Sequence, residues 1–408
     1  DEQVAATSRL LHAKVINDGS KIYVITVKDL KRDLPKVLAQ NALDNLNPDT
    51  KSKDKGTEFL SKAFDSVYMP SESEGIKLVN ELSRAAISAG VQNSAFRVAE
   101  RMSDIALEHL SLGFFDDEHH IHDNDERIDV WAMPVYGNTY TQGLDVAGNS
   151  VRGNYYGITV GADTKLDEIF AGELRVGASF NLGYGEAESK GTVSSITDDY
   201  NFGGINLLAR WKRDNFNLIG NLGLGFSNHD VSMELPSSMQ MSKAQTVVDT
   251  TNLTLDLRAE YLMKTAYVDI LPHIGVRYMA LHTDNYALKS DGKALNYVSS
   301  DTQNIYQVPV GVLISKNYEV SEWLLKSRLD LSLVPVFGDK DAKTHVVYTG
   351  TENVSDEFAT RILDTSAIAA SVGFQASKGN FSLGLDYALK TQSHERQQSV
   401  NLHTVYKF

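Results

Sequence analysis

The chain of 408 residues contains no cysteine, so it has no disulfide framework and no thiolate ligand for a metal ion. No run of apolar residues approaches the roughly 18–20 that a membrane helix requires. Acidic residues outnumber basic ones, and the net charge of −14 excludes the basic surface of nucleic-acid-binding proteins. A nucleotide-binding motif and the Gly-x-Ser-x-Gly turn of serine hydrolases are also missing. We therefore expect no enzyme, no cofactor, no metal site and no nucleic-acid partner.

A membrane barrel is still compatible with these absences, because a barrel strand needs only about 9–11 residues of which every second one is apolar. Residues 126–408 show this period of two throughout. In residues 381–389 the odd positions are apolar and the positions between them are polar or small, and residues 216–226 and 253–261 repeat the pattern. Each predicted strand therefore has one apolar and one polar face, and it exceeds the roughly 5–6 residues usual in soluble sheets.

Charged side chains occupy many positions on the polar faces. We predict that they line a water-filled lumen, and the residues concerned are Glu173, Arg175, Arg210, Arg258, Glu260, Arg277, Lys326 and Arg328. Lipid outside the barrel and water inside it explain both faces of each strand. A large soluble β protein is the alternative, but its exterior would be unusually rich in glycine and charge.

The connections between the predicted strands alternate between short and long. Short turns lie near residues 166–168, 213–215, 264–265, 317–319 and 378–380. Longer polar loops lie near residues 141–150, 186–199, 229–246, 284–302 and 339–357. Bacterial outer-membrane barrels have short periplasmic turns, long outer loops and an even number of strands. We predict a mainly β fold, a transmembrane barrel of about twelve antiparallel strands over residues 126–408.

The first part of the chain differs in pattern. Residues 1–34 contain a strand at 21–27, and residues 35–70 contain helical stretches near 34–46 and 57–67 separated by a charged linker. Residues 71–113 have the longest helical pattern, with a bend expected at Gly90 and an end at Gly113. At about 1.5 Å per residue, residues 91–112 span roughly 33 Å, about one bilayer core. We therefore expect this α-helix to lie inside the barrel lumen.

Several segments in this order resemble the β-domain of autotransporters, the translocators of type V secretion, over residues 71–408. The predicted helix followed by residues 129–137 is similar to the family's pore helix and first strand. Residues 156–165 and 174–178 are similar to its second hairpin. The last strand ends in an aromatic residue and resembles the terminal signal read by the outer-membrane assembly machinery, carried here by Val400, Leu402, Tyr406 and Phe408.

The resemblance implies a barrel in the outer membrane of a Gram-negative bacterium, with the N-terminal part of the chain at the cell surface. It implies periplasmic chaperones, the assembly machinery, the lipid bilayer and the chain's own passenger as partners. By the same resemblance, residues 1–34 look like the end of a β-solenoid passenger, and the passenger passes outward as a hairpin while the helix stays in the pore.

Four other interpretations stand beside this one. Some family members cleave themselves at an asparagine of the pore helix, for which Asn93 is the candidate; the alternative is a polar residue that faces the lumen. The acidic, histidine-rich run at residues 116–123 is either a cation site or, as we favour, a solvated loop. A protease at the outer rim would draw on Asp198, Asp199, His229, Asp230 and His282. The fourth interpretation is a passive outer-membrane pore or a surface adhesin.

Overall fold

The computed structural model describes residues 11–17, 22–28, 54–58, 90–114, 128–144, 149–190, 194–235, 241, 243–350 and 354–408. Strands β1 (Leu11–Asn17) and β2 (Ile22–Lys28) pair antiparallel in a sheet of their own, which agrees with the strand predicted at 21–27. Several predicted segments lie outside the described residues. They are the helical stretch at 34–46, most of the helical stretches at 57–67 and 71–90, and the histidine-rich run at 116–123.

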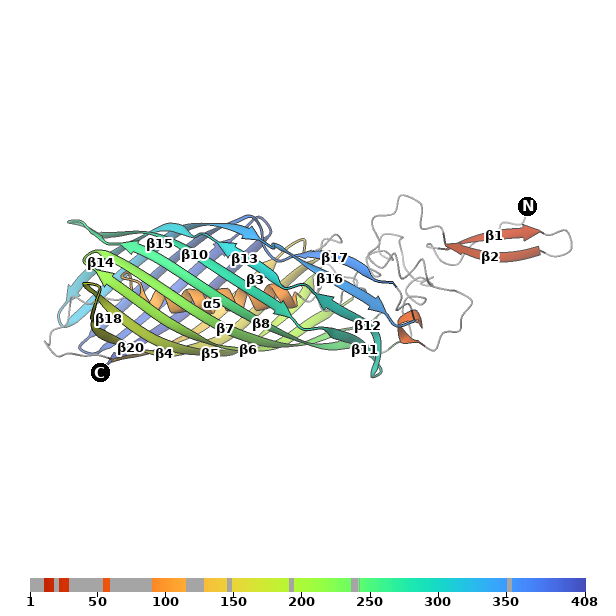
Figure 1. Ribbon diagram of the computed structural model, residues 1–408, viewed down its shortest axis with the longest axis horizontal. Helices are drawn as coiled ribbons and strands as arrows, with labels where there is room; N and C mark the ends of the chain where they lie inside the picture. The colour runs from red at the N-terminus through yellow and green to blue at the C-terminus, as the bar shows by residue number, and fades with distance from the viewer. Residues whose placement is uncertain are drawn as a thin grey trace.

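The remaining strands form one closed antiparallel barrel (Figure 1). They are β3 (Ile128–Thr141), β4 (Ser150–Ile169), β5 (Gly172–Lys190), β6 (Ile196–Arg213), β7 (Phe216–Met233), β8 (Ala244–Tyr261), β9 (Met263–Lys264), β10 (Asp269–Thr283), β11 (Tyr286–Ser290), β12 (Lys293–Ser300), β13 (Gln303–Gln307), β14 (Val310–Val320), β15 (Trp323–Gly338), β16 (Asp341–Tyr348), β17 (Asp356–Arg361), β18 (Ser366–Lys378), β19 (Phe381–Thr391) and β20 (Glu395–Lys407). Some of the short elements are segments of longer, interrupted strands, so that the barrel has 12 strands in all. This confirms the predicted fold class.

The barrel closes where its last strand, β20, pairs with its first, β3. The pairing runs from Glu395 opposite Thr141 to Asn401 opposite Val135, and it resumes at Thr404 opposite Ala132. The interruption falls at Pro134, which has no backbone N–H to donate. Proline in a sheet is confined to edge strands and bulges, and β3 is an edge strand until the barrel closes.

The outer surface has the layered composition of a membrane barrel. Its middle carries exposed apolar side chains, such as Leu207 and Leu257, each 53% exposed. Near one end, the ring of Tyr156 lies 5.0 Å from that of Tyr136 and 5.2 Å from that of Tyr184. Near the other end, Tyr406 and Phe408 and further aromatic residues form a second belt. An apolar band between two aromatic belts is the signature of a lipid-facing barrel wall.

Several of the predicted long loops contain strand. β6 and β7 continue past the tyrosine belt through residues 196–201 and 227–233, and the stretches 284–302 and 339–357 contain β11, β12, β16 and the first residues of β17. Beyond the bilayer the outer face of each strand contacts water and no longer needs apolar side chains, whereas the inner face stays buried, as at Ile196 and Met233, and the backbone hydrogen bonds continue. The sequence pattern therefore marked the end of the apolar band and not the end of the sheet.

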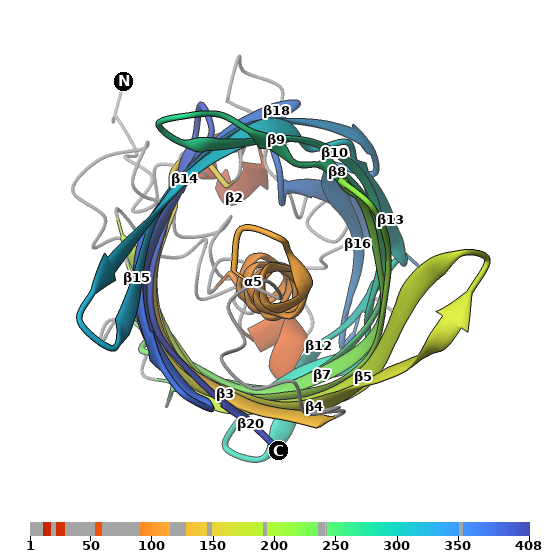
Figure 2. The same cartoon turned by 90° about the vertical axis from the view of Figure 1, so that its left-hand side faces the viewer.

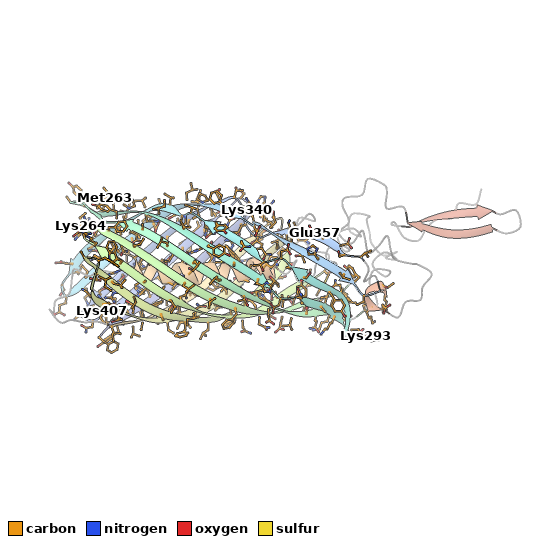
Figure 3. All side chains as sticks on the ribbon, viewed as in Figure 1. Met263, Lys264, Lys293, Lys340, Glu357 and Lys407 are labelled. Carbon is orange, nitrogen blue, oxygen red and sulfur yellow. The ribbon has the colours of Figure 1, made fainter. Side chains whose placement is uncertain are left out.

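The two ends of the barrel differ. The short turns and both ends of the barrel chain lie at one end, where Lys264 and Lys407 are labelled in Figure 3. The longer extensions lie at the opposite end, near Lys293 and Glu357 (Figure 3). We refer to these as the inner and the outer end, because short turns face the periplasm in bacterial barrels. Among the described residues, no helix combines the length and the apolarity needed to cross a bilayer.

Candidate functional site: the lumen and its helix

Helix α5 (Val91–Leu110) lies inside the barrel along its axis, as the end-on view in Figure 2 shows. It begins after Gly90, whose left-handed φ of 79° favours glycine, and the earlier part of the predicted helix, residues 71–89, lies outside the described residues. A Cβ on Gly90 would also lie 3.0 Å from the side chain of Val151. The helix ends at Leu110, three residues before the predicted end at Gly113, and Ser111 caps it through its backbone N–H.

One side of α5 is apolar and packs against the barrel wall. Its buried residues Val98, Met102, Ile105, Ala106 and Leu110 belong to one cluster with wall residues of β3, β4, β6, β7 and β20. The wall side chains of this cluster are Trp131, Met133, Val135, Tyr155, Tyr200, Phe202, Leu208, Ile219 and Val405. This contact draws the helix to one side of the lumen.

The opposite side of α5 carries charges that pair with the facing wall. Glu100 accepts hydrogen bonds from Lys390 at 2.6 Å and Gln307 at 2.7 Å, and it forms an ion pair with Arg97 at 3.0 Å. Arg97 also pairs with Glu395 of the closing strand β20. These two cations and two anions form a neutral cluster. Arg97 and Glu100 are each only 1% exposed, so the cluster is almost completely removed from water.

A second polar cluster lies around Asp256 of β8. Its carboxylate accepts hydrogen bonds from Ser103 at 2.5 Å, Asn221 at 2.9 Å and Arg277 at 2.5 Å. Arg277 in turn donates to Asp104 of the helix at 2.7 Å. The helix is thus bonded to β7, β8 and β10 through charged or polar side chains that satisfy one another.

The C-terminal end of α5 is held in place at the inner mouth of the barrel. Glu260 accepts hydrogen bonds from the hydroxyl of Ser111 at 2.7 Å and from the backbone N–H of Leu112 at 3.1 Å. Lys326 donates to the backbone carbonyl of Leu112 at 3.1 Å. His109 stacks on Trp131, with ring centroids 4.3 Å apart. The segment after the helix is therefore held by side chains of β8 and β15.

The helix does not fill the lumen. Between its charged side and strands β8, β10, β15 and β18 to β20 lies a cavity of about 120 Å³. Charged side chains line it, including Asp104, Glu108, Arg258 and Asp330. A cavity of this character beside a docked helix means that the cross-section of the barrel is wider than one α-helix.

The eight charged residues predicted to face the lumen all lie inside the barrel. Besides the contacts given above, Arg175 pairs with Asp129 and Asp163, Arg210 with Glu173, and Arg258 with Glu260. Arg328 pairs with Asp386 and lies 3.3 Å above the ring of Phe114. The four residues of the predicted assembly signal lie on the outer face of β20 or just after it, and their exposed fractions are 40% for Val400, 41% for Leu402, 46% for Tyr406 and 64% for Phe408.

Sequence reasoning missed the partners on the helix and in the wall. Glu100 and Lys390 are 290 residues apart, and no local pattern links such positions. The buried Trp131 in the first predicted strand was a usable signal, because a tryptophan on the lumen face needs a partner for its N–H. It donates to Asp163 at 3.1 Å.

Asn93 lies in the first turn of α5 with both polar atoms of its side chain hydrogen-bonded. Its amide nitrogen donates to the carbonyl of Ile362 at 3.2 Å, and its amide oxygen accepts from Thr141 at 3.1 Å. This arrangement holds the asparagine side chain against the barrel wall.

The residues considered for a rim protease only partly converge. Asp199 and Asp230 lie on the outer surface, and His282 is paired with Asp284 at 3.3 Å. Inside the barrel, His229 contacts Asp198 through Nδ1 and Ser227 through Nε2, both at 2.8 Å. The Ser227 hydroxyl also lies 2.6 Å from that of Thr250. This is the geometric order of a serine hydrolase triad, but Asp198 and His229 have no exposed surface.

Within the part of the chain that the structure describes, no cluster of three or more histidine, aspartate or glutamate side chains is arranged to hold a metal ion. The charged residues of the lumen instead neutralise one another in pairs. The lumen is therefore suited to hold the helix through ion pairs and hydrogen bonds with the barrel wall.

This architecture is shared with a known protein family and with solved structures. The family model of the autotransporter β-domain matches residues 130–388, more than half of the chain. The translocator domain of autotransporter NalP from Neisseria meningitidis is 16% identical, and the match covers 79% of this chain and 98% of that one with a TM-score of 0.54. The β-domain of the Bordetella autotransporter BrkA is 12% identical, over 69% of this chain and 100% of that one, with a TM-score of 0.52.

At these identities the two structures show a shared fold. No curated protein matches the chain. The family match, the 12-stranded barrel and its lipid-facing surface agree with the resemblance seen in the sequence. The chain therefore belongs to the autotransporter family, and its barrel is an outer-membrane translocator domain.

Proposed function

We propose that the barrel exports the region upstream of α5 to the cell surface and that α5 then remains in the lumen. The observation that carries this proposal is the direction of the helix. Its first turn contacts Thr283 and Ile362 at the outer end, and Leu112 contacts Glu260 at the inner end. The N-terminal end of the helix therefore lies at the outer end of the barrel, where residues 54–58 also lie.

The width of the lumen supports passage of an extended chain. An α-helix with its side chains is about 10–12 Å across. Two extended strands lie about 4.7–4.9 Å apart, so a hairpin is similar in width to a helix. The lumen holds α5 and leaves a cavity of about 120 Å³ beside it. A hairpin fits through such a space when the helix is absent, and the paired charges of the wall offer hydrogen-bonding groups to a chain in transit.

Assembly in the outer membrane is the second part of the proposal. The outer face of β20 presents Val400, Leu402, Tyr406 and Phe408 to the surroundings, in a strand that pairs with β3 only when the barrel closes. We infer that the outer-membrane assembly machinery binds this strand and that periplasmic chaperones deliver the unfolded chain.

The buried charges argue against a passive pore as the main function. In the neutral cluster, Arg97 and Glu100 of the helix pair with Lys390 and Glu395 of the wall. Separation of the helix from the wall would leave charges on both sides without partners, which is costly. We also propose that the barrel is not an enzyme, because the Ser227 hydroxyl is bonded to its neighbours beside a helix that occupies the lumen.

Surface labelling in living cells tests export. The chain has no cysteine, so a single introduced thiol is the only reactive site. We expect a membrane-impermeant maleimide to label Lys28→Cys, in β2, on intact cells. Lys264→Cys, at the inner end, is the matched control and should react only after the outer membrane is permeabilised. Equal protection of both cysteines on intact cells would contradict export.

A further inference from the structure

A short segment upstream of the pore helix is docked on the outer end of the barrel. Residues 54–58 form one helical turn, drawn in orange beside β12 in Figure 1. The backbone N–H of Gly56 donates to the hydroxyl of Thr349 at 2.7 Å, and the hydroxyl of Thr57 donates to the carbonyl of Thr349 at 3.3 Å. Thr349 follows directly after β16, so the segment is bonded to the part of the sheet that extends beyond the membrane.

The Thr349 hydroxyl joins the segment to a second strand. It lies 3.2 Å from the carbonyl of Ala294 and 3.3 Å from that of Leu295, both in β12, and it is the donor in these contacts. A hydroxyl has one proton to donate and lone pairs to accept with. Thr349 therefore accepts from the incoming Gly56 while it donates to β12, and both of its capacities are used when the segment is present.

The contact is shaped for glycine on both sides. A Cβ on Gly56 would lie 2.4 Å from the carbonyl oxygen of Leu295 and 2.5 Å from that of Thr349, which are backbone atoms that cannot turn away. A Cβ on Gly350 would lie 2.1 Å from the hydroxyl of Thr57, and Gly350 has a φ of +87°. Two backbones therefore approach each other more closely than any residue with a side chain allows.

A charge contact completes the site. The ammonium of Lys55 lies 3.0 Å from the carboxylate of Glu58 within the segment and 3.7 Å from that of Asp291 in the turn between β11 and β12. Gly56 and Thr57 are buried in the contact, whereas Asp291 is exposed at the tip of the hairpin. The contact has hydrogen-bonded backbone groups at its centre and charged side chains at its rim.

We propose that the groove formed by Leu295, Thr349 and Gly350 is a docking site for the chain's own exported linker, with Gly56 as the residue it recognises. The proposal rests on the export proposed above, because residue 56 reaches this groove only from outside the barrel. Docking fixes the upstream region on the β11–β12 side of the outer mouth. Because the linker can reach the groove only after export, docking also stabilises the exported position of the linker relative to the unexported one.

Cross-linking of the purified, full chain in detergent tests docking without reference to export. The variant Lys55→Cys/Asp291→Cys places two thiols at the rim of the groove, and a short thiol-to-thiol cross-linker joins them when the segment is docked. Lys55→Cys/Glu188→Cys, with the second thiol on β5, is the control for random encounter. We expect the first pair to cross-link at low reagent concentration and the second pair not to.

The groove variants measure specificity. Thr349→Val keeps the shape but removes the Gly56 hydrogen bond and the bond to β12. The bond to β12 is present whether or not the segment is docked, so only the lost Gly56 hydrogen bond changes the docking equilibrium, which we expect to fall about five-fold. Gly56→Ala should reduce the cross-link through the backbone clash. Thr344→Val is the matched control, because Thr344 lies in the same strand pair and contacts Ser300 but not the segment. Heat-modifiable gel mobility verifies that every variant is a folded barrel.

Equal cross-link yields for Thr349→Val, Gly56→Ala and Thr344→Val would overturn the docking site. Failure of export has a different signature. In that case Lys28→Cys stays protected on intact cells, while the purified protein still cross-links between residues 55 and 291. The two proposals are therefore separable by experiment.

Discussion

Replacement of Glu100 by alanine tests whether buried charges hold the helix in the lumen. Glu100 is 1% exposed and interacts with Arg97, Lys390 and Gln307. Without its carboxylate, the cluster keeps two cations and one anion, so one buried positive charge is left uncompensated. Loss of one partner from a buried ion pair costs about 3–5 kcal/mol. This lowers the docking equilibrium of the helix by roughly two to four orders of magnitude.

Single-channel recording in planar bilayers measures the effect. We expect Glu100→Ala to raise the fraction of time spent in a high-conductance state, because the helix leaves the lumen more often. In the double variant Glu100→Ala/Lys390→Ala, one cation and one anion remain and the cluster is neutral again. It should therefore recover part of the loss, and the difference gives the coupling between the two residues.

A surface ion pair provides the control for this prediction. Glu188 and Lys190 are paired at 2.5 Å on the outer extension of β5, with side chains 54% and 45% exposed. Exposed pairs contribute only about 0–1 kcal/mol, so Glu188→Ala should leave the conductance unchanged. If Glu100→Ala and Glu188→Ala gave the same open fraction, the charged cluster would not be what retains the helix.

Three further predictions concern single residues. Deletion of Phe408 should lower outer-membrane levels of the chain while the refolded barrel keeps its melting temperature, because Phe408 is 64% exposed and contributes little packing; normal levels would count against the assembly signal. A fluorophosphonate probe should not label Ser227, which is only 7% exposed, and labelling abolished by Ser227→Ala would show an enzyme. The unsubstituted chain should keep its mass of 45.0 kDa on storage, because the side-chain amide of Asn93 is hydrogen-bonded to Ile362 and Thr141. A fragment that forms from this chain but not from Asn93→Ala would show self-cleavage.

Much of the fold was predictable because each barrel strand carries its own signal. The alternation at residues 253–261 places Leu255 and Leu257 on the lipid side and Asp256 in the lumen, as the structure has them. The strand extensions beyond the membrane were missed, because their outer faces contact water and no longer carry the regular apolar side chains of the lipid-facing wall. The helix was predictable from its own periodicity and its place before the first strand.

The site was less predictable than the fold. The sequence suggested that Arg175, Arg258 and Arg277 face the lumen, but the acids that pair with them depend on strand register. Asp104 meets Arg277 from the helix across 173 positions of the sequence. The position of a helix inside a barrel is a tertiary property, and local patterns do not contain it. The groove for Gly56 was missed for the same reason, since a glycine in a charged linker predicts only flexibility.

Deletion of the helix tests whether α5 occupies the pore. We propose that the upstream chain has passed through this pore and that α5 then remained in it. The measurement is the conductance of the full chain and of a variant without residues 91–110, both refolded and shown by heat-modifiable mobility to be closed barrels. We expect a several-fold higher and steadier conductance for the variant, because the helix no longer narrows the lumen. An unchanged conductance would mean that the helix does not occupy the pore.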